Sequence, residues 1–245
     1  MNEEINNEIF DRSKDKKGPE GTKILGRDVK LLWLMLIKPI EDYLIGKKCH
    51  PDALTYTTLI VSAFTGLLFS FGWVFLAGVF LLAGSTADIF DGRLARALGV
   101  SSARGAFLDS SVDRVAELFI YIGIMSHLRD SVFIYVILLV VGSSVFVSYM
   151  RARAEALGID CAVGVMQRTE RVVYLGVASL LNFFVDALAR MAGFYGGDYG
   201  LKIALVALLV FSSYTAFERL RHTLKEIETM EEKTPKDSPW KTPSS

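Results

Sequence analysis

Hydrophobic residues lie in long uncharged blocks along this chain, not in the short periodic pieces typical of soluble domains. No charged residue occurs between Asp52 and Asp88, and residues 131–150 form a second uncharged block. Because a helix needs about 20 apolar residues to cross a bilayer core, the second block suits one crossing and the first nearly two. The first block has a break at Phe71-Gly72-Trp73, where glycine interrupts a helix and tryptophan suits the membrane interface. The pattern predicts an all-α, polytopic integral membrane protein.

Hydropathy and charge together predict six transmembrane helices, at residues 53–71, 73–98, 105–126, 131–155, 171–190 and 200–221. Hydropathy alone is weakest for the third, fifth and sixth, since the third is charged in its first half and the other two are short. If the N-terminus is cytoplasmic, the outer loops hold only Arg129, Arg190 and Lys202, and the other flanking Lys and Arg residues lie inside. This asymmetry follows the positive-inside rule and predicts that both termini are cytoplasmic.

The segments outside these crossings are polar or interrupted. Residues 1–28 form a polar tail expected to be disordered, and residues 29–46 are apolar with charges and a proline in the middle. That pattern favours an amphipathic helix in the membrane interface, with a short cytoplasmic cap helix as the alternative. The six-helix domain would occupy residues 47–222, followed by a polar tail at 223–245 that is expected to be disordered from residue 228. Two cysteines give neither a disulfide framework nor a zinc spacing, and the polar start argues against a cleavable signal peptide.

Four aspartates occur where the second and third crossings meet. At about 100° per residue, one face of the second crossing carries two acids, two small residues and, at its edge, an arginine: Asp88, Asp91, Gly92, Ala95 and Arg96. One face of the third crossing carries Gly105, Asp109 and Asp113 at intervals of four residues. The short loop between the two helices would let these faces oppose each other and bring the four carboxylates together.

Such a cluster of acids indicates a site for divalent metal ions. Ionised groups within a membrane cost at least a few kcal/mol each, so converging carboxylates need compensating cations. An oxygen-only ligand set without His or Cys prefers hard ions such as Mg²⁺ or Mn²⁺, and carboxylates that bridge two metals serve phosphoryl chemistry. The alternative, simple pairing with nearby arginines, would explain one or two of the aspartates but not four beside small residues.

The spacing Asp88-x2-Asp91-Gly92-x2-Ala95-Arg96-x8-Gly105-x3-Asp109-x3-Asp113 resembles the complete signature of the CDP-alcohol phosphatidyltransferases. The resemblance implies that Asp88, Asp91 and Asp109 hold two divalent ions, and that Asp113 completes the site and acts as general base. It also implies a set of contacts to a CDP-activated lipid: Gly92, Ala95, Arg96, Ser102 and Gly105. Asp52 and Thr55 resemble the family's Pro-Asn/Asp-x-x-Thr segment and are further candidates, although Pro51 could simply start a helix. A homodimer is implied in the same way.

Four arginines lie at the cytoplasmic ends of the fourth and fifth crossings: Arg151, Arg153, Arg168 and Arg171. Because the guanidinium fork binds phosphate bidentately, they favour an acceptor alcohol that carries its own phosphate. The alternative is that they only orient the helices and pair with Glu155 and Glu170. The segments SYMRARAEALG and QRTER resemble the phosphatidylinositol-phosphate and archaetidylinositol-phosphate synthases, although Arg151 stands where lysine is common and Gln167 replaces a glutamate.

The resemblance to those synthases implies inositol 1-phosphate as acceptor and CDP-diacylglycerol, or its archaeal equivalent, as donor. The implied acceptor-binding set is Ser148, Arg151, Arg153, Arg168 and Arg171. Glycerol 3-phosphate is the second acceptor, since it would also use a phosphate site. A cation transporter is an alternative of another class, but it should have acids near mid-membrane. No nucleic-acid partner is expected, and a prokaryotic cytoplasmic membrane is the expected location.

Two further predictions concern single positions. Glu117 follows Asp113 by four residues, so it could support the site or pair with Arg114. Four glycines are expected at close helix contacts: Gly66, Gly78, Gly142 and Gly176.

Overall fold

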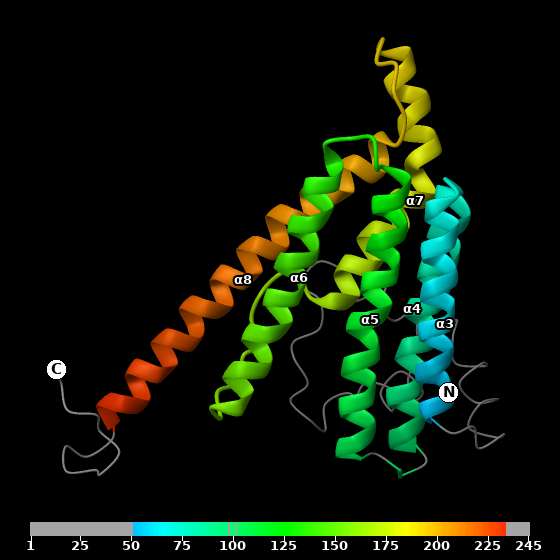
Figure 1. Cartoon of the computed structure of the whole chain (residues 1–245). Coiled ribbons are helices and arrows are strands. Elements are labelled where there is room, and N and C mark those ends of the chain that lie inside the picture. Colours follow the sequence, from blue (N-terminus) through cyan, green and yellow to red (C-terminus); the bar gives the residue numbers. More distant parts are fainter. Residues whose placement is uncertain (1–50, 98, 101, 234–245) are drawn as a thin grey trace, which may run out of the picture.

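The computed structural model describes residues 51–97, 99–100 and 102–233, with side chains for all of these except 51, 87–93, 95–97 and 233. All regular structure in the described part of the chain is α-helical (Figure 1). The helices are α3 (Pro51–Ser70), α4 (Val74–Ala97), α5 (Ala103–His127), α6 (Phe133–Ala156), α7 (Arg168–Met191) and α8 (Tyr199–Lys233). Each overlaps one of the predicted crossing segments. The predicted tail at 1–28 and the interfacial helix at 29–46 lie outside the described residues.

The end of α8 differs from the sequence prediction. Residues 228–233, expected to belong to a disordered tail, continue the helix to Lys233. Their composition of Glu, Met and Lys favours helix, and the preceding turn is anchored because Ile227 packs against a small buried cluster that includes Ala154 and Cys161. Tertiary contact therefore extends the helix beyond its apolar part.

Several helices are suited to a membrane. By length and composition, four described segments could cross a bilayer: Asp52–Ser70, Phe133–Ala156, Arg168–Met191 and Tyr199–Glu232. The apolar part of α4, Val74–Thr86, is shorter. Large apolar side chains such as Leu138 and Phe184 are exposed on the outside of the helices, as expected for contact with lipid. The protein is thus an all-helical integral membrane protein, and the crossing of α4 and α5 stays a prediction.

The predicted break between the first two helices is confirmed at Gly72, whose φ is 78°. The N–H of Gly72 donates to the carbonyl of Phe69 at 2.9 Å, and that of Trp73 to the carbonyl of Leu68 at 3.0 Å. These two bonds form a Schellman motif, in which the left-handed residue is usually glycine because it has no Cβ. The chain therefore reverses here and returns as α4.

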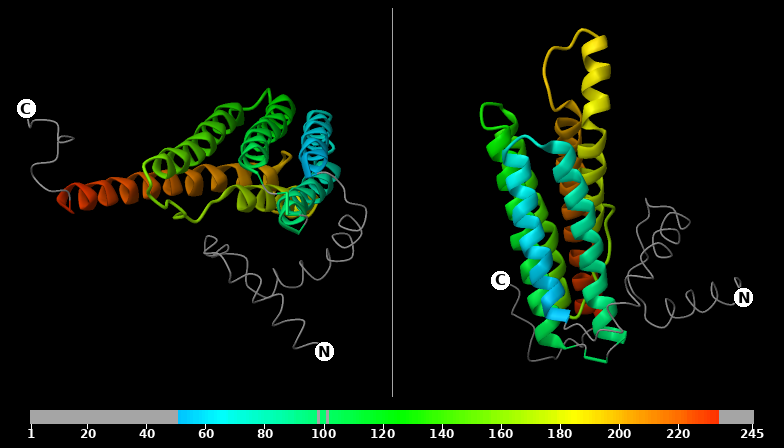
Figure 2. Two further views of the ribbon diagram at one scale, coloured as in Figure 1. Left: turned by 90° about the horizontal axis from the view of Figure 1, so that it is seen from below. Right: turned by 90° about the vertical axis from the view of Figure 1, so that its right-hand side faces the viewer.

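Glycines set the closest helix contacts. α3 packs against both α4 and α5, while α7 packs against α4 and α8, and α6 against α8 (Figure 2). A Cβ on Gly123 of α5 would overlap the backbone of Gly66 of α3, so these helices touch backbone to backbone. The predictions for Gly66, Gly78 and Gly176 are confirmed, since a Cβ on any of them would overlap the facing helix. The prediction for Gly142 was wrong, because the space beside it is open.

The end of the bundle that holds the α3–α4 turn has an apolar core and a polar clasp. Phe69, Ile124 and Leu205 are fully buried there. The clasp consists of His127, Asn182, Asp186 and Asp198. His127 Nε2 lies 2.9 Å from Asp198 Oδ2, and Asn182 Nδ2 donates to Asp198 Oδ1 at 3.1 Å. Asp186 accepts the backbone N–H groups of Asp198 and Tyr199, so the clasp ties the end of α5 and the side of α7 to the start of α8.

Candidate active site

The predicted metal ligands lie at the opposite end of the bundle, on α4 and α5. Asp109 and Asp113 are one turn apart in the first half of α5, and both side chains are partly buried. Asp88 and Asp91 belong to the second half of α4, which leads into α5 through a short connection (Figure 1). The two acidic helix segments are therefore brought to the same end of the bundle, as the sequence predicts.

The metal site itself rests partly on undescribed side chains. Among the side chains that the structure describes, no three His, Cys, Asp or Glu residues gather closely enough to hold an ion. Asp88 and Asp91 are not part of that set, so the four-carboxylate cluster stays a prediction. The donor chemistry nevertheless fits, since the expected ligands are all carboxylates and these prefer hard divalent cations.

Asp113 is joined to Arg168, the first residue of α7. Arg168 Nη1 lies 2.7 Å from Asp113 Oδ2, and the two side chains are 25% and 14% exposed. The sequence assigned these residues to different roles, Asp113 as base and Arg168 as acceptor contact. Their ion pair places the predicted base and a predicted acceptor contact side by side.

A second ion pair lies one turn deeper between the same helices. Arg171 Nε and Nη2 donate to the two carboxylate oxygens of Glu117, at 2.8 and 3.1 Å. Arg171 is only 1% exposed. The predicted pairing of Glu117 with Arg114 was wrong: Arg114 donates to the backbone carbonyl of Ser110 instead. Glu117 is therefore paired across to α7 and not with Arg114 on its own helix.

A capping box fixes the first turn of α7. The carboxylate of Glu170 accepts the backbone N–H of Gln167 at 2.5 Å, and the Gln167 side chain accepts a backbone N–H of the same turn. This cap sets the direction in which the helix leaves the preceding loop, and so it places Arg168 and Arg171. Glu170 is therefore engaged in capping, whereas Glu155 does pair with Arg151, at 2.8 Å on the surface of α6.

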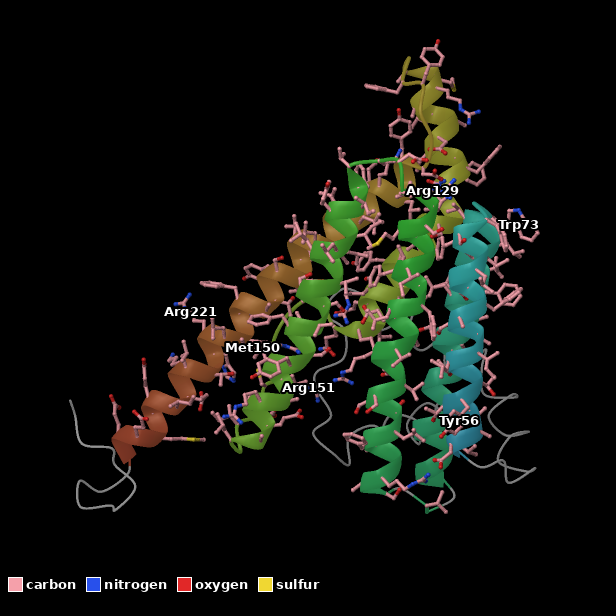
Figure 3. The ribbon with its side chains drawn as sticks, viewed as in Figure 1. Tyr56, Trp73, Arg129, Met150, Arg151 and Arg221 are labelled. Atoms are coloured by element: carbon pink, nitrogen blue, oxygen red, sulfur yellow. The ribbon has the colours of Figure 1, made fainter. Side chains whose placement is uncertain are left out.

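Arg219 of α8 is a candidate that the sequence did not reveal. It is 2% exposed, its Nε donates to the carbonyl of Val163 at 2.9 Å, and its Nη1 donates to that of Val147 at 2.7 Å. It lies close enough to Arg151 and Arg171 for the positive charges to repel (Figure 3 marks Arg151). In the sequence, Arg219 resembles any positive residue flanking a crossing. The sequence carried no signal that set it apart, because hydropathy does not show which of the flanking arginines are buried.

The remaining predicted contacts are placed as follows. Asp52 accepts a hydrogen bond from Arg104 at 2.8 Å, and Thr55 is buried one turn further along α3. Ser102 caps α5, accepting the backbone N–H of Gly105 at 3.0 Å. Pro51 does begin α3, as the alternative reading had it. The structure does not describe side chains at three further predicted positions, Gly92, Ala95 and Arg96.

Two small cavities adjoin Glu117. One, of about 20 Å³, is lined by polar and apolar side chains of four helices, the polar ones including Thr58 of α3, Ser85 of α4 and Arg168 of α7. That volume is enough for one water molecule. The other, of about 10 Å³, lies between α5 and α6, and Ser144 and Ser148 line it. Ser148 thus lies beside Glu117, whereas Arg153 of α6 is exposed.

Comparison with known proteins identifies the family. The model of the family described as CDP-alcohol phosphatidyltransferase matches residues 48–217. The archaetidylinositol phosphate synthase of Methanothermobacter thermautotrophicus is 30% identical over 192 residues, which cover 78% of this chain and 90% of that protein. The phosphatidylinositol phosphate synthase of Cutibacterium acnes is 30% identical over 196 residues, covering 77% and 92%.

Solved structures agree with these relatives. The crystal structure of Mycobacterium tuberculosis phosphatidylinositol phosphate synthase with CDP-DAG bound has a TM-score of 0.66 and 26% identity, over 77% of this chain and 94% of that one. The structure of the same protein in complex with manganese and citrate has a TM-score of 0.65 and 27% identity, covering 76% and 88%. The chain therefore belongs to the CDP-alcohol phosphatidyltransferase family and is a membrane-bound phosphotransferase.

Proposed function

We propose that the protein transfers a lipid phosphate from a CDP-activated lipid to the hydroxyl of inositol 1-phosphate, with release of CMP. The observation that carries this proposal is the 2.7 Å ion pair between Arg168 and Asp113, which places a predicted acceptor contact beside the predicted base. Arg171 and Arg219 lie near each other and are almost fully buried, although Glu117 offsets the charge of Arg171 and Arg219 donates to two backbone carbonyls. A phosphate on the acceptor would add an anion to this cationic end of the bundle.

The relatives support the choice of acceptor. The archaeal and bacterial proteins described above are named as inositol phosphate synthases, and they match this chain over most of its length. Glycerol 3-phosphate could use the same arginines, but none of the relatives described above is named for it. The cation-transporter alternative is not favoured, since the family consists of transferases.

The donor and the metal ions would occupy the α4–α5 end. Asp88, Asp91, Asp109 and Asp113 would hold two divalent ions, Mg²⁺ or Mn²⁺, and the manganese in the mycobacterial structure supports this assignment. When bound, the ions neutralise negative charge on the donor's pyrophosphate. The cytidine nucleotide would contact Gly92, Ala95 and Arg96, with Asp52, Thr55, Ser102 and Gly105 around them.

The residues of this chain would then carry the reaction as follows. Asp113 accepts the proton of the acceptor hydroxyl as the oxygen forms a bond to the lipid-bearing phosphorus, and the bond from that phosphorus to CMP breaks. Arg168 holds the Asp113 carboxylate in place through the 2.7 Å ion pair. Because aspartate is a weak base for an alcohol, much of the rate must come from positioning. Ser148 and Arg153 would complete the acceptor side.

The proposal extends to location and assembly. The active end and both chain termini would face the cytoplasm of a prokaryotic cell, as the distribution of Lys and Arg predicts. The protein would act as a homodimer, in line with its family.

CMP release from a CDP-activated lipid by the purified protein in mixed micelles tests the proposal. The acceptors are inositol 1-phosphate, free inositol, glycerol 3-phosphate and serine, each with Mg²⁺ or Mn²⁺. Turnover with inositol 1-phosphate alone, abolished in Asp113→Asn and retained in Asp130→Asn, is the expected result. Asp130 is a suitable control because it is fully exposed in the turn after α5. Turnover with glycerol 3-phosphate or free inositol instead would overturn the acceptor assignment.

A further inference from the structure

The buried pair of Glu117 and Arg171 leaves one part of the guanidinium unused. Glu117 takes Nε and Nη2, which together form one edge of the planar group. Nη1 is buried and has no hydrogen-bond partner among the residues that the structure describes. Buried donors are nearly always satisfied, so an unsatisfied N–H group of a buried cation indicates a missing partner.

The charges around Nη1 show what kind of partner would fit. Arg219 lies close enough to Arg171 and to Arg151 for the positive charges to repel one another. Glu155 lies near Arg219 and Glu170 near Arg171, but Glu155 pairs with Arg151, Glu170 caps α7, and neither accepts a hydrogen bond from Nη1. An anion is the partner that would both accept the Nη1 hydrogen bond and offset the repulsion.

Glu117 decides where that hydrogen bond points. A guanidinium is rigid and planar, so a bidentate carboxylate fixes its plane as well as its position. Glu117 lies one turn from Asp113 on α5, and Arg171 lies one turn from Arg168 on α7. The Glu117–Arg171 pair therefore aligns the same two helices that the Asp113–Arg168 pair joins.

We propose that Glu117 is a positioning residue that aims Nη1 of Arg171 at the phosphate of the acceptor. It touches no substrate itself and acts only through Arg171. This inference rests on the proposed function, in which the acceptor carries a phosphate. It accounts for a buried acid that the sequence signature does not include.

The competing explanation is a purely structural ion pair that holds α5 to α7. If the pair were purely structural, a substitution of Glu117 would lower stability and leave the KM values of both substrates unchanged. The effect on KM for the acceptor, compared with KM for the CDP-activated lipid, therefore separates the two explanations.

Glu117→Asp is the deciding variant. It keeps the buried negative charge, so the fold is retained, but its shorter side chain cannot hold both edge donors of Arg171 in the same plane. Glu117→Gln removes the charge and leaves the buried cation without compensation, which is expected to lower stability as well. Glu228→Gln is the matched control, because Glu228 is exposed near the end of α8.

The readouts are steady-state KM values for inositol 1-phosphate and for the CDP-activated lipid, with competition by inorganic phosphate against the acceptor. In Glu117→Asp we expect KM for the acceptor and the inhibition constant for phosphate to rise about tenfold or more, with KM for the donor within twofold. Equal KM values in Glu117→Asp and the parent would overturn the inference. If the parent protein itself uses no phosphorylated acceptor and phosphate does not compete, the proposed function fails, and this inference fails with it for that separate reason.

Discussion

Arg168 is a residue whose effect on turnover can be separated from its effect on stability. Its ion pair with Asp113 is partly exposed to solvent, and such pairs contribute about 1 kcal/mol or less to folding. Arg168→Lys keeps the positive charge but loses the fork that can hold Asp113 and an acceptor phosphate together. We expect kcat/KM for the acceptor to fall about tenfold to a hundredfold, with little change in the melting temperature.

The matched control for this substitution is Arg221→Lys. Arg221 is exposed on α8 and points away from the other helices (Figure 3). Steady-state kinetics and thermal unfolding of both variants make the test. Parent-like kcat/KM in Arg168→Lys would mean that a point charge suffices and that the fork has no role at this position.

At the scale of helices, the contact of α3 with α5 depends on the absence of side chains. A Cβ on Gly123 would overlap the backbone of Gly66, and backbone cannot move aside as a flexible side chain can. We expect Gly123→Ala to destabilise the protein by about 1–3 kcal/mol or more, measured as a lower melting temperature in detergent. Gly142→Ala is the control, since its Cβ would meet open space and alanine favours helix. An equal loss of stability in both variants would show that helix propensity, and not close contact, governs these positions.

The same helices show what the sequence could and could not predict. A bilayer requires long apolar segments with internally paired backbones, so hydropathy together with charge placement located the helices, and the glycine at 72 located the first turn. Hydropathy does not determine which helix faces which. The pairing of Glu117 with α7, the burial of Arg219 and the open space at Gly142 all depend on neighbours distant in the sequence. The aspartate spacing predicted a site at the α4–α5 end, but its supporting ion pairs required the packed structure.

Across the whole molecule, the polar groups are divided between two ends with different consequences. The α4–α5 end holds ion pairs beside the predicted base, while the clasp of His127, Asn182, Asp186 and Asp198 closes the other end. The apolar core around Phe69 and Ile124 separates them. Because the clasp lies far from Asp113 and contacts no predicted substrate residue, changes in it should alter stability without altering KM.

The clasp also predicts how stability depends on pH. The hydrogen bond from His127 lowers the pKa of Asp198 below its ordinary value of 3.8 in the folded protein. A depressed carboxyl pKa contributes stability that is fully present above the unfolded-state pKa and is lost as the pH falls through the folded-state pKa. Asp198→Asn is the suitable variant, because Asp198 has a φ of 61° and asparagine tolerates that left-handed conformation. We expect this variant to be about 1 kcal/mol less stable at pH 7, with the difference shrinking below about pH 4, and with an unchanged KM for the acceptor. The test is thermal unfolding of Asp198→Asn and the parent from pH 7 to pH 3, with Asp130→Asn, a substitution of an exposed residue, as the control. A stability difference that does not depend on pH over that range would show that the carboxylate charge of Asp198 does not stabilise the clasp.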